Sequence, residues 1–376
     1  MKKNRKAIAL LSGGLDSRLA VKMMLDQGIE VEAVNFVTVF CTCTAKSSCK
    51  SEARKAAEDY GISLKVLNAT DEILEAIRNP RHGFGRGLNP CLDCRISMFR
   101  RAGKYMEETG AGFLITGEVW GERPMSQRPD ALRTIEKESG LDGLIVRPLS
   151  AHLFEPTIPE REGWIDREKM MAIEGRSRKP QMQLAAEIGV NDYPCPAGGC
   201  LLCDRNFAAR LKSLLAEDPH PAIAEIQSLK LGRLLYSSAG RRIMIPRDEE
   251  ESKRLSALAR PGDLFMEAKG HMGPTAVIKN VGSSETSGAD AGGSAATSKA
   301  GASGSAATSK AGASGADIDE STLLEAAALT ARYGQGREEK SVTVAWWPAG
   351  GDSAEHSTLM ASPADGWKLA ESLRRE

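Results

Sequence analysis

Six residues near the start of the chain have the types and spacing of a phosphate-binding turn. The segment Ser12–Ser17 reads serine, two glycines, leucine, aspartate and serine. Paired glycines let the backbone turn tightly and direct its N–H groups at an anion, and the serines add hydroxyl donors. Asp16 would repel a phosphate unless it holds a metal ion or a structural N–H, which implies Mg²⁺. The segment therefore predicts a place where phosphate and a divalent cation bind together.

The sequence on either side supplies the elements that position this turn. Residues 7–11 form an apolar run that is too short for a typical helix and suits a buried parallel strand. Apolar residues between 19 and 24, followed by Gly28, indicate an amphipathic helix. The N-terminus of that helix adds favourable potential for an anion. Neither the Walker pattern nor the G-x-G-x-x-G pattern is present, so the turn is of another kind.

A second chemistry is indicated by the cysteines, all eight of which precede residue 204. Cys91 and Cys94 form a C-x-x-C pair, and Cys195, Cys200 and Cys203 form a later group. Three interpretations remain open from spacing alone. The first is a [4Fe–4S] cluster held by three cysteines. The second is a zinc site in which the pair Cys91 and Cys94 is joined by a second C-x-x-C pair, Cys200 and Cys203. The third is thiol chemistry in which one cysteine carries a persulfide and another resolves it. Clustered cysteines in an intracellular enzyme more often bind metal or do redox chemistry than pack inertly.

The turn at Ser12–Ser17 resembles the PP-loop of ATP pyrophosphatases. Residues 1–205 resemble the tRNA-thiolating members of that group, especially the 2-thiouridine synthases. The resemblance is carried by this turn, by Asn89–Cys94 before a helix, by Thr116-Gly117 after a strand, and by a late Gly-Gly-Cys-Leu-Leu ending at Leu202. The candidate nucleotide-binding residues are Ser12, Gly13, Gly14, Asp16, Ser17, Thr116 and Gly117.

What the resemblance implies is ATP-dependent thiolation of a tRNA uridine, with Asp16 among the catalytic residues. It implies ATP, Mg²⁺ and a [4Fe–4S] cluster held by Cys91, Cys94 and Cys200. The partners would be tRNA and a sulfur donor, either sulfide or a persulfide carrier. Cys203 departs from the family pattern, so a fourth ligand and a zinc site stay open. The sequence assigns no role to Cys41, Cys43, Cys49 or Cys195.

Alternation of strand and helix over residues 1–205 predicts an α/β, doubly wound parallel sheet. The resemblance to the PP-loop enzymes implies that this sheet is of the adenine nucleotide alpha hydrolase kind. Residues 206–230 read as a helical linker. The segment that begins Gly240-Arg-Arg-Ile-Met-Ile is followed by Arg260-Pro-Gly-Asp and Gly273-Pro-Thr-Ala-Val-Ile. With these motifs, residues 231–376 resemble an NFACT-R domain, which implies a second, smaller α+β domain that binds RNA. Within it, residues 282–317 contain an exact eleven-residue repeat of small residues and no aromatics, which predicts a disordered insertion.

Charge and hydropathy set the remaining expectations. Fifty basic residues balance fifty acidic ones, so RNA contact must come from local patches. Six arginines and one acid lie between Arg78 and Arg101, and Arg176, Arg178 and Lys179 form a second patch. No apolar run reaches the roughly 18 residues that span a bilayer, which predicts a cytoplasmic protein without membrane contact. Four side chains after the Thr116 strand are candidates for contact with the nucleotide or base, namely Glu118, Arg123, Gln127 and Arg128.

The function predicted from these observations is an ATP-dependent tRNA sulfurtransferase. Two alternatives come from different classes. One is a zinc-containing PP-loop ligase of the deazaguanine nitrile synthase type, and the other is a non-catalytic, ATP-sensing RNA-binding protein.

Overall fold

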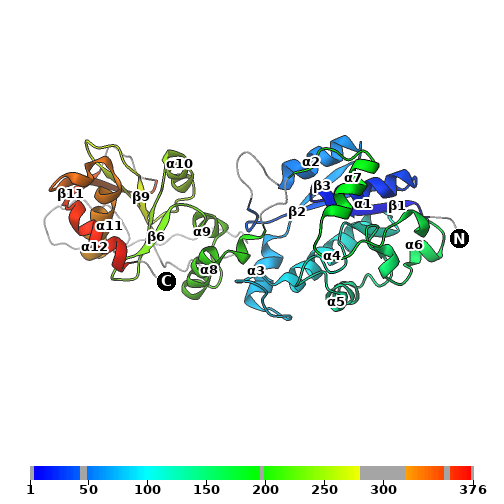
Figure 1. Ribbon diagram of the computed structural model, residues 1–376. Helices are drawn as coiled ribbons and strands as arrows, with labels where there is room; N and C mark the ends of the chain where they lie inside the picture. The colour runs from blue at the N-terminus through cyan, green and yellow to red at the C-terminus, as the bar shows by residue number, and fades with distance from the viewer. Residues whose placement is uncertain (1–3, 43–48, 195–198, 280–317, 351–355, 374–376) are drawn as a thin grey trace, which may run out of the picture. The chain divides into compact units, whose positions relative to one another are not determined.

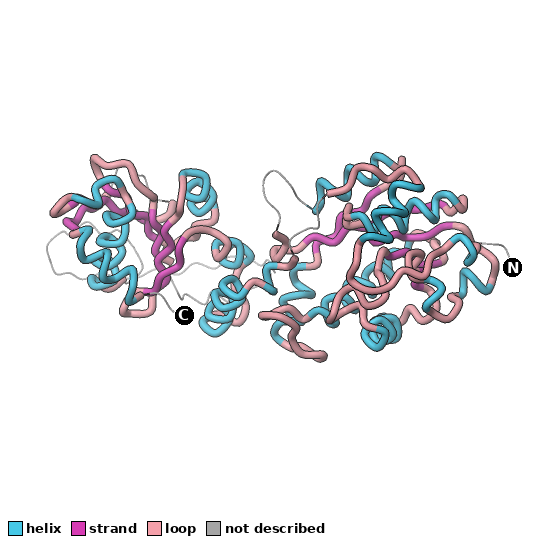
Figure 2. Tube along the Cα trace, in the orientation of Figure 1, coloured by secondary structure: helices cyan, strands magenta, loops and turns pink. Residues whose placement is uncertain are grey.

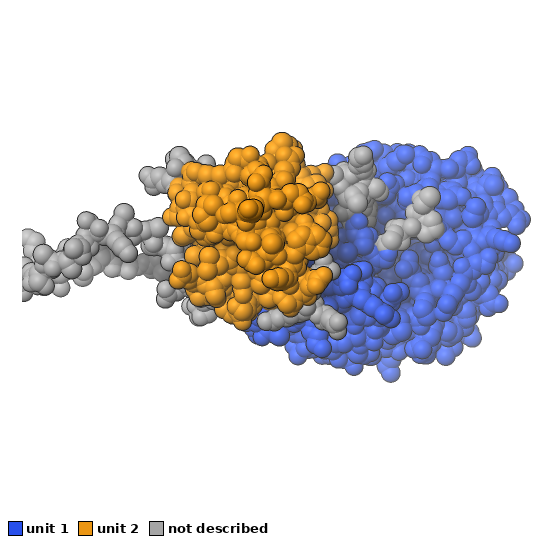
Figure 3. Space-filling view, turned by 60° about the vertical axis from the view of Figure 1, so that its left-hand side comes forward, with its two compact units in different colours: residues 1–219 blue, residues 220–376 orange. Residues whose placement is uncertain are grey.

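The computed structural model describes residues 4–42, 49–194, 199–279, 318–350 and 356–373. Contacts within the chain divide it into two compact units, Met1–Pro219 and His220–Glu376 (Figure 3). The predicted disordered insertion, residues 282–317, lies outside the described residues.

A five-stranded parallel sheet forms the centre of unit 1, with the order β3-β2-β1-β4-β5. The strands are β1 (Lys6–Leu10), β2 (Glu30–Val37), β3 (Leu64–Asn68), β4 (Phe113–Thr116) and β5 (Ile145–Val146). Residues 7–10 of β1 and 113–115 of β4 are apolar, and all of them except Leu10 are buried, so these strands suit the centre of a sheet that is covered on both faces. The doubly wound parallel sheet predicted from the sequence is confirmed.

Helices cover both faces of this sheet (Figure 1). Apolar side chains of α1 and α7 pack on one face, and those of α4 and α5 pack on the other. The helices of unit 1 are α1 (Leu15–Asp26), α2 (Cys49–Asp59), α3 (Thr70–Arg78), α4 (Cys91–Glu108), α5 (Pro129–Ser139), α6 (Ile158–Arg161), α7 (Lys179–Glu187) and α8 (Arg205–Glu217). Short 3₁₀ turns are η1 (Ala151–Leu153), η2 (Arg167–Lys169) and η3 (Leu201–Cys203).

The strand order places a topological switch between β1 and β4. From β1 the chain builds outward through β2 and β3 on one side and, later, through β4 and β5 on the other. In open parallel sheets, ligands bind beyond the carboxyl ends of the strands at such a switch. The turns after β1 and β4 are therefore the ones that the fold presents to a ligand.

Unit 2 is built on a six-stranded sheet with the order β11-β10-β8-β9-β7-β6, in which every pairing is antiparallel. Figure 2 shows the strands of both units in magenta. The predicted smaller α+β domain thus has the expected class of fold. Its elements are α9 (Ile223–Ser228), β6 (Arg233–Tyr236), β7 (Arg242–Ile245), α10 (Glu249–Ala257), β8 (Leu264–Ala268), β9 (Ala276–Ile278), α11 (Glu320–Tyr333), η4 (Gln335–Glu338), β10 (Val342–Pro348), β11 (Ser357–Ala361) and α12 (Pro363–Ser372).

Candidate nucleotide and thiol site

The Gly-rich turn joins β1 to α1 and is held by its own side chains. Ser17 Oγ donates a hydrogen bond to the carbonyl of Gly14 at 2.9 Å, and the N–H of Gly14 donates to Ser12 Oγ at 3.3 Å. Arg18 Nε donates to the carbonyl of Gly13 at 3.1 Å. These bonds fix a turn at the N-terminus of α1, where the first backbone N–H groups have no partner within the helix. The turn is therefore pre-shaped to receive an anion.

Two glycines let neighbouring segments approach this turn closely. Gly13 has φ +81°, and a Cβ there would lie 2.4 Å from the carbonyl carbon of Glu52 in α2. Gly117 follows β4, and a Cβ there would lie 2.5 Å from the carbonyl carbon of Asp16. Real Cβ atoms do not approach backbone this closely, so glycine is required at both positions. The structure thus brings Gly117, and Thr116 before it, against the Gly-rich turn.

Asp16 lies in a group of two carboxylates and two guanidinium groups. Its Oδ1 is buried and has no hydrogen-bond partner, and its Oδ2 lies 3.9 Å from Arg178 Nη2. Burial raises the pKa of Asp16, while Arg178 and Arg123 lower it. Burial and the charge of Asp16 raise the pKa of Glu122.

This environment fits a magnesium–nucleotide complex. An orphaned carboxylate oxygen beside a second carboxylate supplies the oxygen ligands that Mg²⁺ prefers. Arg123 and Arg178 supply charge that complements phosphate. Asp16 and Arg123 are among the nucleotide-site residues predicted from the sequence, whereas Glu122 and the contact of Arg178 with Asp16 are not. Their positions after β4 and before α7 become informative only when the fold brings both segments to the same turn.

Backbone hydrogen bonds bring three cysteine-bearing segments together. The N–H of Leu201 donates to the carbonyl of Phe40 at 3.0 Å, and the N–H of Leu88 donates to the carbonyl of Leu202 at 2.9 Å. Gly87 has φ +67°, and a Cβ there would lie 2.3 Å from the Leu202 oxygen. Because η3 is held between the chain after β2 and the loop before α4, the cysteines of all three segments converge.

Five cysteines among the described residues carry free thiols, namely Cys41, Cys91, Cys94, Cys200 and Cys203. The sequence predicts a helix over residues 95–109, whereas α4 begins at Cys91, so Cys91 and Cys94 lie in its first turn. Pro90 precedes that first turn, and a proline with its fixed φ is well tolerated at a helix start. The earlier start places both thiols at the helix N-terminus.

The thiols influence one another. Burial raises the pKa of Cys94 to about 12, Arg95 opposes that shift, and the charges of Cys200, Cys91 and Cys41 add to it. Burial likewise raises the pKa of Cys200 to about 12. Burial and the charge of Cys203 raise the pKa of Cys91. The structure therefore places Cys41, for which no role is predicted from the sequence, near the other thiols.

The donor chemistry of these residues fits a thiophilic metal or an iron–sulfur cluster, because thiolates are the ligands that both prefer. Among the residues that the structure describes, no three Cys, His, Asp or Glu side chains already stand in ligand geometry. Binding would therefore draw the converging thiols together. Cys43 and Cys195 lie outside the described residues, as does the side chain of Cys49.

The raised pKa values predict slow alkylation of two thiols in metal-free protein. With the pKa raised from 9.0 to about 12 at Cys94 and Cys200, the reactive thiolate fraction near pH 8 is about a thousandfold smaller than for an ordinary thiol. Because a raised pKa keeps the neutral thiol dominant, the rate should keep rising well above pH 9. Iodoacetamide labelling of each residue, followed by mass spectrometry across pH, measures this. Rates at pH 8 equal to those of a cysteine peptide would contradict it.

Glu118 is buried in an ion-pair network rather than exposed in the loop after β4. Its Oε1 lies 3.1 Å from Arg95 Nη2, and its Oε2 lies 3.2 Å from Arg147 Nε. Glu118 is 1% exposed and Arg147 is 3% exposed. Arg147 also pairs with Glu136 at 2.9 Å. Glu118 thus fixes Arg95, the neighbour of Cys94, and connects the thiol helix to the β4 turn.

Glu118→Gln should lower the free energy of unfolding by about 3 kcal/mol, because removing one partner leaves buried charge uncompensated. Urea denaturation measures this. Glu122→Gln is the matched control on the same loop. Because burial and Asp16 raise the Glu122 pKa, its ionised form costs stability, and the neutral variant should be as stable as the wild type or slightly more stable. Equal losses in the two variants would contradict the network.

The other predicted contact residues divide into bound and exposed groups. Gln127 is buried and its Oε1 accepts from the N–H of Arg123 at 3.1 Å, so it shapes the loop. Arg128 pairs with Asp130 at the surface. In the Arg78–Arg101 stretch, four arginines contact other parts of the chain, namely Arg78, Arg95, Arg100 and Arg101. Arg81 and Arg86 are exposed and make no ion pair with the described residues.

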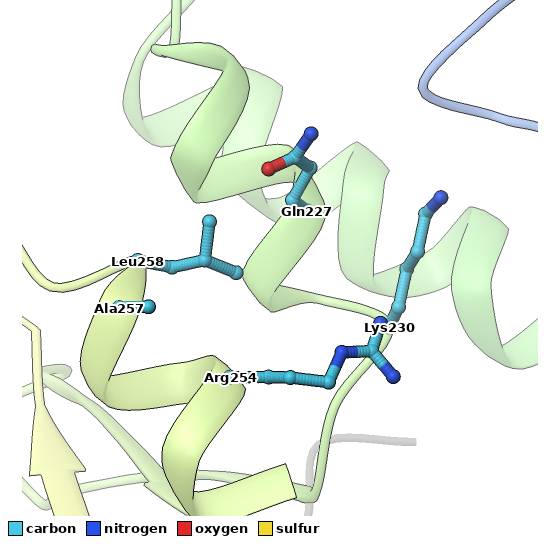
Figure 4. A pocket seen from close by; sticks show the side chains of 5 residues that line it. All are labelled: Gln227, Lys230, Arg254, Ala257 and Leu258. Atoms are coloured by element: carbon cyan, nitrogen blue, oxygen red, sulfur yellow. The ribbon is translucent and has the colours of Figure 1, made fainter. Parts of the chain in front are cut away.

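Unit 2 has a basic hollow between α9 and α10. Gln227 and Lys230 border it from one side, and Arg254, Ala257 and Leu258 border it from the other (Figure 4). Its volume is about 340 Å³. Two cations and an amide over an apolar floor suit a phosphate-bearing ligand.

The first part of the chain is similar to proteins of known family. Residues 3–153 match the family model described as thiamine biosynthesis protein (ThiI). This ThiI-like segment contains the Gly-rich turn, the turn after β4, and the C-x-x-C pair. It ends before η3, so the later cysteines lie outside the match.

Curated relatives match the same part of the chain. A tRNA-specific 2-thiouridylase MnmA of Syntrophotalea carbinolica is 33% identical over 31% of this chain and 35% of its own length. A probable tRNA sulfurtransferase of Thermoanaerobacter sp. is 36% identical over 32% of this chain and 30% of its own length. The chain thus spans about a third of the length of these relatives.

Solved structures were also compared with the chain. A 4-thiouridine synthetase–RNA complex with bound ATP is 24% identical, with a TM-score of 0.32, and the likeness covers 49% of this chain and 51% of that one. Among the helices that the structure describes, none is both long and apolar enough to cross a membrane.

Proposed function

We propose that the protein is an ATP-dependent enzyme that thiolates a uridine of tRNA. One observation carries the proposal most directly: the Arg123 guanidinium lowers the pKa of both Asp16 and Cys91. That residue therefore lies within electrostatic reach of both the candidate nucleotide site and the thiols. Adenylation and sulfur transfer need such adjacency, because the activated atom must meet the sulfur. The names of the curated relatives, which are tRNA thiolating enzymes, support the same reaction.

The reaction proceeds in two balanced steps. The uridine carbonyl oxygen attacks the α-phosphorus of ATP, an O–P bond forms, the bond to the β-phosphate oxygen breaks, and pyrophosphate leaves. The Gly-rich turn, Arg178 and Mg²⁺ stabilise the departing charge. The uridine N3–H proton is lost as the oxygen is adenylated. Hydrosulfide then attacks the activated carbon, the C–O bond breaks and AMP leaves with the oxygen, and the S–H proton passes to N3 so that a C=S bond remains. No net oxidation or reduction occurs when sulfide is the donor.

For the sulfur step, we assign Cys91, Cys94 and Cys200 as ligands of a [4Fe–4S] cluster, which leaves one iron open. When bound, such a cluster supplies an iron on which sulfide can be presented. The protein's own contribution is to bury the thiols and to hold Arg95 beside them through Glu118. Because three thiolates and a cluster carry net negative charge, that cation stabilises the loaded state.

We assign RNA contact to basic side chains in both units. Arg81, Arg86, Arg176 and Lys179 are exposed in unit 1, and Lys230 and Arg254 border the hollow in unit 2. Such groups bind phosphate without reading sequence. Unit 2 would thus act as an RNA-docking domain rather than as a second catalyst.

Comparison of tRNA nucleosides from a deletion strain and its parent tests this function. Mass spectrometry should show one thionucleoside missing in the deletion strain and restored by the wild-type gene. Protein purified without oxygen should contain iron and sulfide and absorb near 400 nm. An unchanged nucleoside profile would contradict thiolation, and zinc without iron would contradict the cluster and favour the ligase alternative.

A further inference from the structure

We propose that a hollow on unit 1, which we call the Phe84 hollow, binds one unpaired base of the RNA substrate. This inference rests on the proposed function and adds a recognition site to it. Phe84 is a large apolar side chain that is 40% exposed on the loop between α3 and α4. An exposed aromatic ring costs free energy in water unless a ligand covers it. The hollow is bordered by Ile77, Arg78, Phe84, Leu88, Lys212, Leu215 and Pro219.

The size and lining of the Phe84 hollow suit a planar aromatic ligand. Its volume is about 320 Å³, at the lower end of small-molecule sites. The side chains of Ile77, Leu88 and Leu215 supply apolar walls, and Phe84 supplies a ring face. Proteins that bind single-stranded RNA stack bases on such rings, because every base has a π-face.

Charge around the Phe84 hollow indicates a polyanion rather than an apolar peptide. Arg78 and Lys212 border it, and none of its lining residues is acidic. Arg78 is already bonded to the Pro219 carbonyl and lies 3.6 Å from Glu75, but Lys212 makes no ion pair with the described residues. Arg81 and Arg86, on the same loop as Phe84, extend the positive charge. An RNA strand satisfies both features, because its base covers the ring and its phosphates meet the cations.

The loop that carries Phe84 also contacts the thiol group. A Cβ on Gly85, the next residue, would lie 3.4 Å from Cys91 Sγ and 3.3 Å from Met125 Cγ. Leu88, which lines the hollow, donates its N–H to the Leu202 carbonyl in η3. Because the Phe84 loop contacts the thiol group, a base held on Phe84 would be a near neighbour, along the RNA strand, of the nucleotide that reaches the thiols. The hollow would position the target by holding its neighbour outside the stack.

Binding of an unmodified tRNA transcript to Phe84 variants tests this proposal. Phe84→Ala should weaken affinity about tenfold, within the range measured for loss of one base–aromatic stack. Phe84→Trp should keep wild-type affinity, and Phe84→Leu should lose nearly as much as Phe84→Ala. Met182→Ala, which removes another exposed apolar side chain of unit 1, is the matched control and should bind normally. Fluorescence anisotropy at fixed salt measures all five proteins, and thermal melts confirm that each is folded.

Wild-type affinity in Phe84→Ala would overturn the proposal, as would full affinity in Phe84→Leu, because an aliphatic side chain cannot stack a base. These results differ from failure of the proposed function. If the wild-type protein itself does not bind tRNA, the proposed function fails and the base-docking proposal that rests on it fails with it. If the wild type binds and Phe84→Ala binds equally, only the base-docking proposal fails.

Discussion

Cys200→Ala should abolish thiolation of tRNA while leaving ATP affinity unchanged. Cys200 precedes η3, whereas the other two assigned ligands lie together on α4. Loss of Cys200 would therefore remove the ligand that closes the set. Since loss of an outer-shell partner already costs 10- to 100-fold at metal sites, loss of a ligand should reduce turnover by more than about 100-fold. Mass spectrometry of the tRNA nucleosides measures thiolation, and calorimetry measures ATP affinity. Both experiments are done without oxygen.

Cys203→Ala separates the cluster from a four-thiolate zinc site. Cys203 accepts a hydrogen bond from Asn89 Nδ2 at 3.0 Å, so its sulfur already has a partner in the protein. With three assigned ligands, this variant should retain iron and most of its activity. If Cys203→Ala loses its metal as completely as Cys200→Ala does, a closed four-thiolate set is indicated. Retained thiolation in Cys200→Ala would contradict the assigned ligands.

Gly117→Ala should lower ATP affinity by at least about tenfold and destabilise unit 1 by roughly 1–3 kcal/mol. The added Cβ would lie 2.5 Å from the Asp16 carbonyl carbon and 2.6 Å from the Ser17 nitrogen. Both atoms belong to the backbone, so the Gly-rich turn itself must move. Displacing that turn disturbs the N–H groups that face the phosphates. Calorimetry with ATP and Mg²⁺, together with urea denaturation, measures both effects.

Gly163→Ala is the matched control for this substitution. Gly163 has φ +64°, but a Cβ there meets nothing within 4 Å. The variant should lose about 1 kcal/mol from backbone strain and keep full ATP affinity. Equal ATP affinities in Gly117→Ala and the wild type would show that the β4 turn does not support a nucleotide site.

The approach of the turn after β4 to the Gly-rich turn follows from local pattern and one fold rule, so the sequence predicts a candidate nucleotide site there. A strand, a Gly-rich turn and a helix are adjacent in the chain. Parallel pairing of β1 with β4 then brings Gly117 to Asp16. The roles of Glu122 and Arg178 depend on where two loops pack, which no local pattern encodes.

The arrangement of the cysteines likewise depends on packing that no local pattern encodes. The C-x-x-C pair is visible in the sequence, but the approach of Cys41 requires the hydrogen bond between Leu201 and Phe40. In the sequence, Glu118 is one of several charged residues in a polar loop. Only tertiary structure shows that Arg95 and Arg147 neutralise it in the interior. Likewise, pattern alone could not separate Arg81 and Arg86 from the arginines that bind the protein's own carbonyls and carboxylates.

Reconstitution of one turnover tests the central claim most directly. Purified protein, reduced and kept free of oxygen, is mixed with ATP, Mg²⁺, sulfide and tRNA from a strain that lacks the gene. The account predicts one thionucleoside in the tRNA and, for each one formed, one AMP and one pyrophosphate. Formation of ADP and phosphate, or release of AMP and pyrophosphate with no thionucleoside, would contradict it.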